Sequence, residues 1–404
     1  MGGLFAVHLF RTIGWEVSVF ERSGDDLASR GAGIGASEAL FAVMRRAGVP
    51  FDSLTGVQRV RSRVCLDGGG TVIAEVPAGG MATAWARIYR ALRGALPAGC
   101  CHFNRSLTRV DQDPHGVTAE FADGARVTAD LLVAADGIGS TVRRQLLPQV
   151  DPRYAGYVAW RGVVEERDTP AQVRARLFEH LTFCFPEGEL LLAMPNPGAG
   201  DDTRPGKRRY YFVWYRPVDY EKTLPGLCTD ASGRQHGVAI PPPLIRADVI
   251  EDLRASAVRA LAPELAAVVA RAEHPLLQAV FDCESSRIAF GRVALVGDAA
   301  FVARPHVAAG VTKAALDALS LVEALAASGG SLDRALEQYD RDQRSFGGRL
   351  VARGRALGAH LEAQQKAPDR GRGPTRDWDP ALYMREYGAD DLVAERHHRL
   401  VNSA

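Results

Sequence analysis

The sequence predicts an α/β protein that combines a parallel sheet, an antiparallel sheet and a C-terminal helical segment. Short apolar strands over 15–20, 131–135 and 293–296 are each followed within two residues by a carboxylate, a pattern typical of the ligand-binding edge of a parallel sheet. Between about 152 and 283, alternating aromatic and apolar stretches indicate an antiparallel sheet. The charged helical pattern over 332–361 predicts the C-terminal segment.

The composition is that of an ordinary globular protein, and it disfavours several classes of function. The chain has 404 residues, enough for two or three domains, and 47% of them are hydrophobic. With 49 Lys and Arg against 48 Asp and Glu, it lacks the basic excess of a nucleic-acid binder. No apolar run is long enough to cross a membrane, and no secretory signal pattern is present. The six cysteines lack metal-site spacing, so we expect reduced thiols, no metal and a cytoplasmic protein.

The chain divides into four segments by its texture. Residues 1–150 and 286–330 are expected to form the two parts of the parallel-sheet domain. Residues 151–285 are expected to form the antiparallel-sheet domain, and residues 331–404 the C-terminal helix and tail. The tail after Lys366 predicts a loop-rich wrap with one short helix, because it carries several Gly and Pro residues.

The N-terminal segment has the form of half a dinucleotide-binding fingerprint. Gly2 and Gly3 open a predicted helix over 4–13, and the strand over 15–20 ends at Glu21. In such a fingerprint the glycines let a helix and a strand pack closely near a pyrophosphate. Glu21 lies eighteen residues after Gly3, close to the spacing of the acidic residue that binds a ribose. A half-motif of this kind also occurs by chance.

Two hairpins are predicted between the N-terminal motif and residue 131. Apolar stretches over 57–66 and 71–76 flank an Asp-Gly-Gly-Gly turn. The stretches over 117–121 and 125–128 flank an Asp-Gly turn. Both pairs are therefore expected to be antiparallel.

A second acidic motif follows the strand over 131–135. Asp136 and Gly137 end that strand, and Ser140 and Arg143 come soon after. The motif has two interpretations. Asp136 either caps the following helix or lies at a ligand-binding edge of the sheet.

The third acidic motif is the most specific of the three. The strand over 293–296 delivers Asp298 to the carboxyl edge of a sheet, where a carboxylate can hold a polyol hydroxyl. Pro305 stiffens the loop that follows, and Gly310 opens a long helix over 311–326. The positive N-terminal end of that helix favours an anion.

Taken together and in this order, these motifs resemble the group A flavoprotein monooxygenases, the single-component FAD-dependent aromatic hydroxylases. The resemblance extends from the start of the chain to about residue 326, and its markers are Gly-Gly-Leu at 2–4, Glu-Arg-Ser at 21–23, Arg-Gly-Ala-Gly-Ile at 30–34, Ala-Asp-Gly-Ile-Gly-Ser at 135–140 and Gly-Asp-Ala-Ala at 297–300. The segment 154–164 and Arg-Pro-His at 304–306 are similar to the 2,6-dihydroxypyridine 3-monooxygenase-like branch. The parallel-sheet domain is then an FAD-binding, Rossmann-like domain, and the antiparallel sheet is the substrate domain.

The resemblance implies that the N-terminal motif holds the adenosine half of FAD. Gly2 and Gly3 would line the pyrophosphate. Glu21 would bind the adenosine ribose, with Arg22 beside it. Arg30 would reach the diphosphate or the ribityl chain.

The resemblance also implies that the later motifs hold the flavin half of FAD. Asp136 would lie near the pyrophosphate and in the path of NAD(P)H. Asp298, with Gly297 beside it, would hold the ribityl chain, and Pro305 would lie beside the isoalloxazine. The helix N-terminus presented to the flavin would consist of Ala309, Gly310 and Val311.

The implied activity is hydroxylation of a small hydroxylated aromatic or N-heteroaromatic ring through a flavin C4a-hydroperoxide, with O2 and either NADH or NADPH as co-substrates. A base near the flavin would activate the ring, and the candidate catalytic residues are His306 and Pro305. His306 has a second interpretation, as a loop histidine bonded to backbone or ribose. Arg161 is the candidate substrate contact. The oligomeric state is open, with a homodimer as the candidate.

Two other functions are compatible with the same motifs. One is an epoxidase or oxidoreductase of the same fold in a biosynthetic pathway. The other is an inactive remnant that binds no flavin. The remnant is considered because the family has one strand and one fingerprint glycine before the position of Gly2, which this sequence lacks. We expect about ten further residues upstream, roughly one strand and a turn, and poor FAD binding without them.

Overall fold

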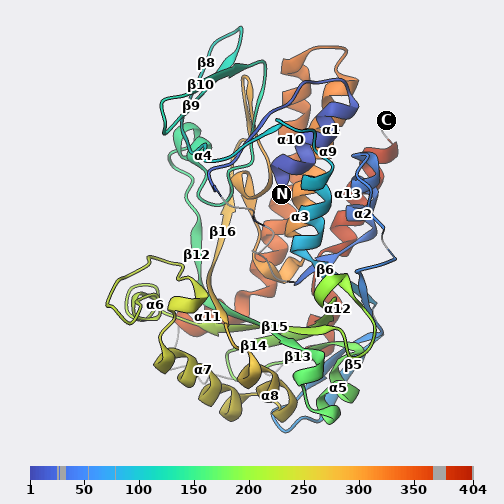
Figure 1. Ribbon diagram of the computed structural model, residues 1–404, viewed down its shortest axis with the longest axis vertical. Helices are drawn as coiled ribbons and strands as arrows, with labels where there is room; N and C mark the ends of the chain where they lie inside the picture. Colours follow the sequence, from blue (N-terminus) through green and yellow to red (C-terminus); the bar gives the residue numbers. More distant parts are fainter. Residues whose placement is uncertain (25–26, 28–32, 53, 78, 367–378, 403–404) are drawn as a thin grey trace.

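The protein has two parts that are connected by two long strands (Figure 1). The structure is a computed structural model, and it describes residues 1–404 except 25–26, 28–32, 53, 78, 367–378 and 403–404. The connecting strands are β12 (Arg153–Glu165) and β16 (Leu276–Glu284), which pair with each other antiparallel. None of the helices in the described part of the chain has the length and apolarity needed to cross a membrane.

The first part contains helices packed around short strands, as expected for the parallel-sheet domain. Strand β11 (Leu132–Ala134) pairs parallel with β18 (Val293–Leu295), although the two are far apart in the sequence. Strand β1 (Val19–Phe20) pairs parallel with β7 (Cys101–His102). The strand predicted over 15–20 is therefore only two residues long, because only Val19 and Phe20 pair with β7.

The remaining strands of the first part form small antiparallel pairs. The predicted hairpin over 117–128 is confirmed as β9 and β10. The strands are β2 (Gly33–Ala36), β3 (Gln58–Val60), β6 (Gly80–Ala84), β8 (Leu107–Gln112), β9 (Val117–Phe121), β10 (Arg126–Ala129) and β17 (Ala289–Phe290).

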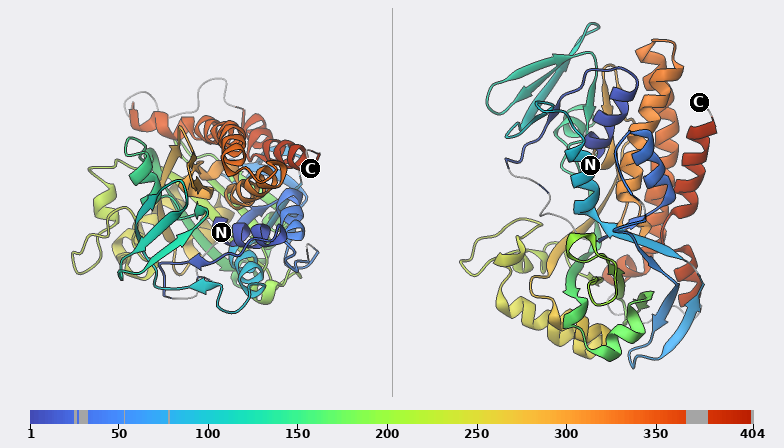
Figure 2. Two further views of the ribbon diagram at one scale, coloured as in Figure 1. Left: turned by 90° about the horizontal axis from the view of Figure 1, so that it is seen from above. Right: turned by 45° about the vertical axis from the view of Figure 1, so that its right-hand side comes forward.

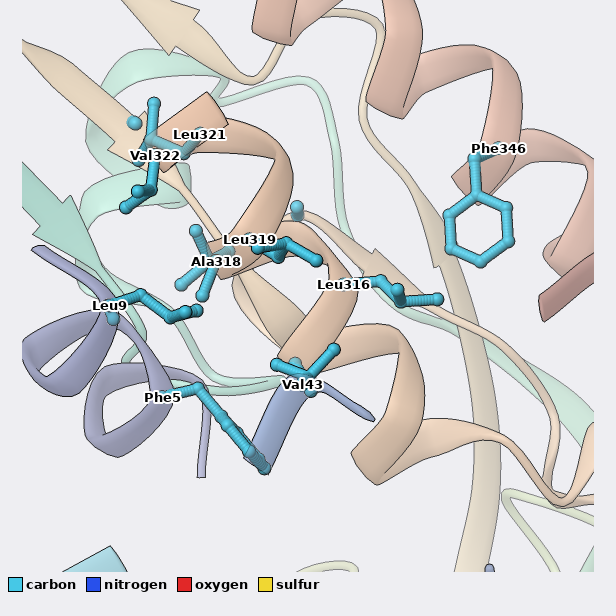
Figure 3. Close-up of a cluster of buried hydrophobic side chains, with 14 of the residues drawn as sticks. Phe5, Leu9, Val43, Leu316, Ala318, Leu319, Leu321, Val322 and Phe346 are labelled. Carbon is cyan, nitrogen blue, oxygen red and sulfur yellow. The ribbon is translucent and has the colours of Figure 1, made fainter. Parts of the chain in front are cut away.

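The core of the first part lies between four helices (Figure 3). Figure 3 shows Phe5 and Leu9 of α1 (Gly2–Thr12) on one side of α9 and Phe346 of α10 on the other. Leu316 of α9 and Val43 of α2 belong to the same cluster, and all five side chains are buried. The predicted N-terminal helix and the helix after residue 310 are both confirmed. The bounds of the other helices on this side are α2 (Glu38–Arg46), α3 (Trp85–Gly94), α4 (Thr141–Leu146), α9 (Gly310–Ala327) and α10 (Leu332–Leu357).

The second part is built on an eight-stranded mixed sheet. The strand order is β19-β16-β12-β15-β14-β13-β4-β5, and all pairs are antiparallel except β13 with β4. The predicted hairpin over 57–76 thus supplies two strands to this sheet from the N-terminal segment. The remaining bounds are β4 (Ser62–Leu66), β5 (Val72–Val76), β13 (His180–Cys184), β14 (Leu190–Asn196), β15 (Arg209–Pro217) and β19 (Phe301–Val302).

The aromatic residues of this sheet divide between its two faces. Trp160 and Trp214 belong to the cluster under α7 (Ala247–Ala260) and α8 (Pro263–Arg271). Tyr157, Phe183 and Tyr211 belong to the cluster on the opposite face. Aromatic side chains therefore occupy both faces of the sheet, because successive side chains of a strand point to opposite faces. One face is covered by helices, and the other is directed toward the first part of the protein (Figure 2).

Two helical predictions need correction. The Ala-rich sequence over 249–272 predicts one helix, but the segment is split into α7 and α8, because Pro263 cannot continue a helix but readily starts one. The part of the tail that the structure describes, 379–402, holds two helices and not one, α12 (Pro380–Glu386) and α13 (Asp390–Asn402). Between them and α10 lies α11 (Ala359–Lys366). The domain boundaries at 150, 285 and 330 stay a prediction.

Helix α10 offers a matched test of how tightly it packs against β19. A Cβ on Gly347 would overlap the ring of buried Phe301, whereas one on Gly348 would meet only the flexible side chain of Glu284 at 3.1 Å. We expect Gly347→Ala to lower the free energy of unfolding by about 1–2 kcal/mol through overpacking. We expect Gly348→Ala to raise it by about 0.5–1 kcal/mol through helix propensity. Denaturant unfolding of both variants checks this, and equal effects of the two would contradict the packing described.

Candidate active site

The turn after β18 places a carboxylate at the edge of the buried parallel strands. Gly297 has φ +63°, which favours glycine, and a short 3₁₀ turn over Gly297–Ala299 follows. Asp298 is exposed, although the residues on either side of it are buried. Desolvation by the surrounding protein raises the pKa of Asp298, while the nearby charges of Lys313 and Arg143 act in the opposite direction.

Helix α9 begins a short distance from this turn with an uncapped N-terminus. Ala309 stands at the N-cap position without a side-chain cap, and Gly310 is exposed with no atom within 4 Å of where a Cβ would lie. Its unpaired N–H groups and its dipole favour negative charge in that space. Val311, the next residue, is half-buried.

These two features fit the flavin half of FAD. An exposed carboxylate such as Asp298 can accept hydrogen bonds from the hydroxyls of a ribityl chain. The open N-terminus at Gly310 can face the flavin edge that becomes negative on reduction. The residues present therefore suit the cofactor that the motifs imply.

The N-terminal glycines lie against the ends of the two parallel strands. A Cβ on Gly2 would be 3.3 Å from Cγ2 of Val296, and one on Gly3 would be 3.5 Å from Cβ of Ala135. The glycines thus allow α1 to approach the sheet closely, as the fingerprint requires.

Glu21 faces the same region as Asp298. Burial lowers the pKa of the amino group of Met1, and the negative charges of Asp298 and Glu21 oppose this shift in part. Glu21 also accepts a hydrogen bond from the N–H of Ser23 at 2.9 Å. Arg22 is exposed, and Arg30 lies outside the described residues.

Asp136 serves as a helix cap. Its carboxylate accepts hydrogen bonds from the hydroxyl of Ser140 at 2.6 Å and from the N–H groups of Thr141 and Val142 at 2.7 and 3.2 Å, at the start of α4. The motif therefore caps the helix, but Asp136 is not its N-cap residue: that is Ser140, whose hydroxyl accepts the N–H of Arg143 at 2.9 Å. A contact of Asp136 with FAD or NAD(P)H stays a prediction.

Arg143 of the same motif connects it to the turn that carries Asp298. Its side chain is fully buried, and Nη1 donates to the carbonyls of Asp298 and Ala299 at 3.2 and 3.1 Å. Nη2 donates to the carbonyl of Ile138. The sequence motif contains Arg143 but does not indicate its role, since only the tertiary structure brings the two turns together.

The loop between the turn and α9 carries a histidine on the sheet side. Pro305 starts a 3₁₀ turn over Pro305–Val307, and Ala308 adopts a left-handed conformation with φ +49°. The carbonyl of Ala308 leaves no room for a side chain at Gly35, which explains the glycine there. The loop therefore runs tightly against β2.

His306 is fully buried and bonded to two tyrosines. Its Nε2 lies 2.8 Å from the hydroxyl of Tyr157 on β12, and its Nδ1 lies 3.3 Å from the hydroxyl of Tyr383 on α12. Burial is the main cause that holds the pKa of His306 well below its ordinary value, so the imidazole is neutral. The interpretation as a histidine bonded to backbone or ribose does not describe these contacts.

Arg161 lies on the same face of the sheet as Tyr157. Its Nη1 donates to the hydroxyl of Tyr211 at 2.6 Å, and its buried Nε has no hydrogen-bond partner. Among the described residues, no carboxylate forms an ion pair with it. The hydroxyls of Tyr211, Tyr215 and Tyr387 outweigh the effect of desolvation and raise its pKa, so Arg161 is charged.

The C-terminal tail closes this face of the sheet. Tyr383 and Tyr387 come from α12 and its end, and Arg63 of β4 holds that end by donating to the carbonyls of Met384 and, at 2.9 Å, of Tyr387. Neither tyrosine was predicted from the sequence as a residue of this site. The only signal for them was the Asp-Pro pair at 379–380, which marks a helix start but does not show where the helix docks.

Comparison with known proteins supports FAD as the cofactor. A profile described as "FAD binding domain-like" matches residues 154–282, and one described as "FAD binding domain" matches residues 251–354. The chain is 31% identical over 323 residues to 2,6-dihydroxypyridine 3-monooxygenase of Paenarthrobacter nicotinovorans, covering 80% of each protein. It is 30% identical over 412 residues to 3-amino-4-hydroxybenzoate 2-monooxygenase of Streptomyces cremeus, covering 97% of this chain and 94% of that protein.

The fold also agrees with solved structures. The structure of 2,6-dihydroxypyridine-3-hydroxylase from Arthrobacter nicotinovorans superposes with a TM-score of 0.83 at 28% identity, covering 94% of this chain and 92% of that one. A Klebsiella pneumoniae protein in complex with FAD and uric acid superposes with a TM-score of 0.72 at 22% identity, covering 99% of this chain and 94% of that one, which supports the fold alone. The resemblance drawn from the sequence motifs is confirmed: this chain belongs to the family of FAD-dependent aromatic monooxygenases.

Proposed function

We propose that this enzyme hydroxylates a small, hydroxylated and anionic aromatic or N-heteroaromatic ring, with FAD as cofactor and NAD(P)H and O2 as co-substrates. The observation that carries the proposal is a charged, half-buried Arg161 without a carboxylate partner among the described residues, on the sheet face that also presents Tyr157 and His306. A cation held inside a protein is costly unless an anion pairs with it. A phenolate, hydroxypyridine anion or carboxylate would supply that partner.

The relatives act on rings of this chemistry. Their names identify 2,6-dihydroxypyridine and 3-amino-4-hydroxybenzoate as substrates, both of which carry acidic groups on a single ring. The tyrosine hydroxyls around Arg161 are suited to orient such groups by hydrogen bonds. The aromatic side chains on the same face, including Phe183 and Tyr383, would exclude water from the ring.

The cofactor would be held by residues of the first part. Asp298 would bind the ribityl chain, and the N-terminus of α9, with Ala309, Gly310 and Val311, would face the flavin. FAD, when bound, supplies the redox chemistry that carries electrons from NAD(P)H to O2. Gly2, Gly3, Glu21 and Gly297 would complete the contacts to the rest of the cofactor.

His306 would act through a tyrosine and not by direct contact with the ring. Both of its ring nitrogens are engaged with the hydroxyls of Tyr157 and Tyr383, and its side chain has no exposed surface. A neutral imidazole donates from one nitrogen and accepts at the other, so it can take up a proton that one of these hydroxyls relays from the substrate. Pro305 would fix the loop that carries it.

The activity is tested by supplying candidate rings to the enzyme loaded with FAD. We expect 2,6-dihydroxypyridine or 3-amino-4-hydroxybenzoate to stimulate NAD(P)H oxidation, with a product that has gained one oxygen atom, as mass spectrometry can show. A product that has lost two hydrogens and gained no oxygen would indicate a dehydrogenase of the same fold and contradict the proposal.

Asp298→Ala tests the assignment of the ribityl contact. We expect its FAD affinity to fall about tenfold to a hundredfold, because a hydrogen bond to a charged group contributes roughly 1.5–3 kcal/mol. Fluorescence titration with FAD measures this. Asp248→Ala, at a carboxylate that is exposed and remote in the second part, serves as the control and should leave the affinity unchanged. Unchanged affinity in both variants would remove Asp298 from the site.

Arg161→Met tests the anion contact. We expect kcat/KM for the anionic ring to fall about tenfold to a hundredfold, mainly through KM, since a hydrogen-bonded charge pair is lost. FAD affinity should not change. Arg161→Lys, which keeps the charge, should restore part of the loss. An unaltered KM in Arg161→Met would show that the ring binds elsewhere.

His306→Asn tests the neutral, buried histidine. The folded-state pKa of His306 lies well below its unfolded value of about 6.5, so the unfolded chain binds the extra proton first as the pH falls. We expect the free energy of unfolding to decrease below about pH 6.5, by up to about 1.4 kcal/mol per pH unit for this group. The variant should show a shallower decrease in denaturant titrations between pH 7 and 5. An identical slope in the two proteins would mean that folding does not lower the pKa of His306.

A further inference from the structure

A buried polar network links the C-terminal helix α13 to the turn that carries Asp298. We propose that Gln343 of α10 and Arg396 of α13 are positioning residues for FAD: they hold Asp317, and Asp317 holds the turn. The inference rests on the proposed contact between Asp298 and the cofactor. It assigns the tail of the chain a part in cofactor binding, although no residue of α13 belongs to the site itself.

The inner end of the network consists of Asp317 and Lys313, which form hydrogen bonds with the backbone of Gly297. Oδ2 of Asp317 accepts the N–H of Gly297 at 2.8 Å and also Nζ of Lys313 at 2.8 Å. Nζ of Lys313 in turn donates to the carbonyl of Gly297 at 2.7 Å. Both the N–H and the C=O of this residue are thus bonded to one ion pair, whose side chains are only 2% exposed. The residue that follows Gly297 is Asp298.

The outer end of the network orients Asp317. Nε2 of Gln343 donates to Oδ1 of Asp317 at 2.5 Å, and Oε1 of Gln343 accepts from Nε of Arg396 at 2.7 Å. Nη2 of Arg396 donates to the hydroxyl of Ser320 at 2.6 Å. Gln343 has no exposed surface.

The donors and acceptors of the network show which side chain orients which. A glutamine amide presents donors on one side and an acceptor on the other, so only one orientation of Gln343 serves a carboxylate and a guanidinium together. Arg396 fixes that orientation, and Gln343 fixes the rotamer of Asp317. Without them, one oxygen of the buried carboxylate of Asp317 loses its donor. It must then find another donor by moving, and the backbone of Gly297 moves with it.

The test compares two substitutions in the network with the same substitutions just outside it. Gln343→Leu is matched by Gln338→Leu, one turn earlier on α10, where the amide bonds to Asp342 at the surface. Arg396→Met is matched by Arg399→Met on α13, whose side chain is 66% exposed and pairs with Glu395. For each variant, the FAD dissociation constant is measured by fluorescence titration, and the unfolding midpoint is measured with and without FAD.

We expect Gln343→Leu and Arg396→Met each to weaken FAD binding about tenfold, and both controls to stay within twofold of the unchanged protein. The double variant should be no weaker than either single one, because residues in one linear network are not additive. Arg396→Lys keeps the charge but cannot donate to Gln343 and Ser320 together, so its FAD affinity should fall about as much as that of Arg396→Met. It is the variant to use if the others do not fold.

Two results would overturn the proposal. If the FAD dissociation constant stays within twofold while the unfolding midpoint without FAD falls, the network stabilises the fold and does not position the cofactor. If the double variant multiplies the two single losses, Gln343 and Arg396 act independently. A failure of the Asp298 assignment gives a different result. In that case Asp298→Ala itself leaves the FAD affinity unchanged.

Discussion

A single constraint governs this protein: a carboxylate must stay exposed at the end of a fully buried strand. Strand β18 is buried along its whole length, and three residues after its end the side chain of Asp298 is exposed. Such a turn needs the left-handed conformation of Gly297 and a bonding partner for each backbone group. Arg143 of α4 and the ion pair of Lys313 and Asp317 on α9 supply those partners, and each of their side chains is buried.

The same loop joins the cofactor side to the sheet that would hold the ring. Within eight residues the chain passes from Asp298, in the open space, to His306, which is enclosed by Tyr157 of the sheet and Tyr383 of the tail. Arg304, just before it, is buried and pairs with Asp282 at 2.8 Å and with Glu362 at 2.9 Å. The loop that leads to His306 is therefore fixed to the sheet and to α11 by buried polar contacts.

Local patterns in the sequence predicted the elements and the motifs well, because strand ends, glycine turns and helix starts depend on neighbouring residues. The Gly297–Asp298 turn, the start of α9 and the cap at Asp136 are of this kind. Contacts between distant segments were not predicted, since no pattern relates Tyr383 to His306 or Arg396 to Gln343 before the tail is placed. Two breaks could have been predicted from proline positions. Pro263 marks the start of α8, and the pair Asp379-Pro380 marks the start of α12.

The arrangement of the tail limits how the two parts can move. Helix α12 is anchored to β4 through Arg63, and α13, which lies at the side of the protein near α2 (Figure 1), is anchored to α9 and α10 through Arg396. Only Tyr387, Gly388 and Ala389 separate the two helices, a tether of roughly 10 Å at full extension. A hinge motion that draws the sheet away from the cofactor side must first unseat one of these anchors. Exchange of small molecules with the interior therefore depends on local rearrangement of loops and side chains, while the frame around them stays closed.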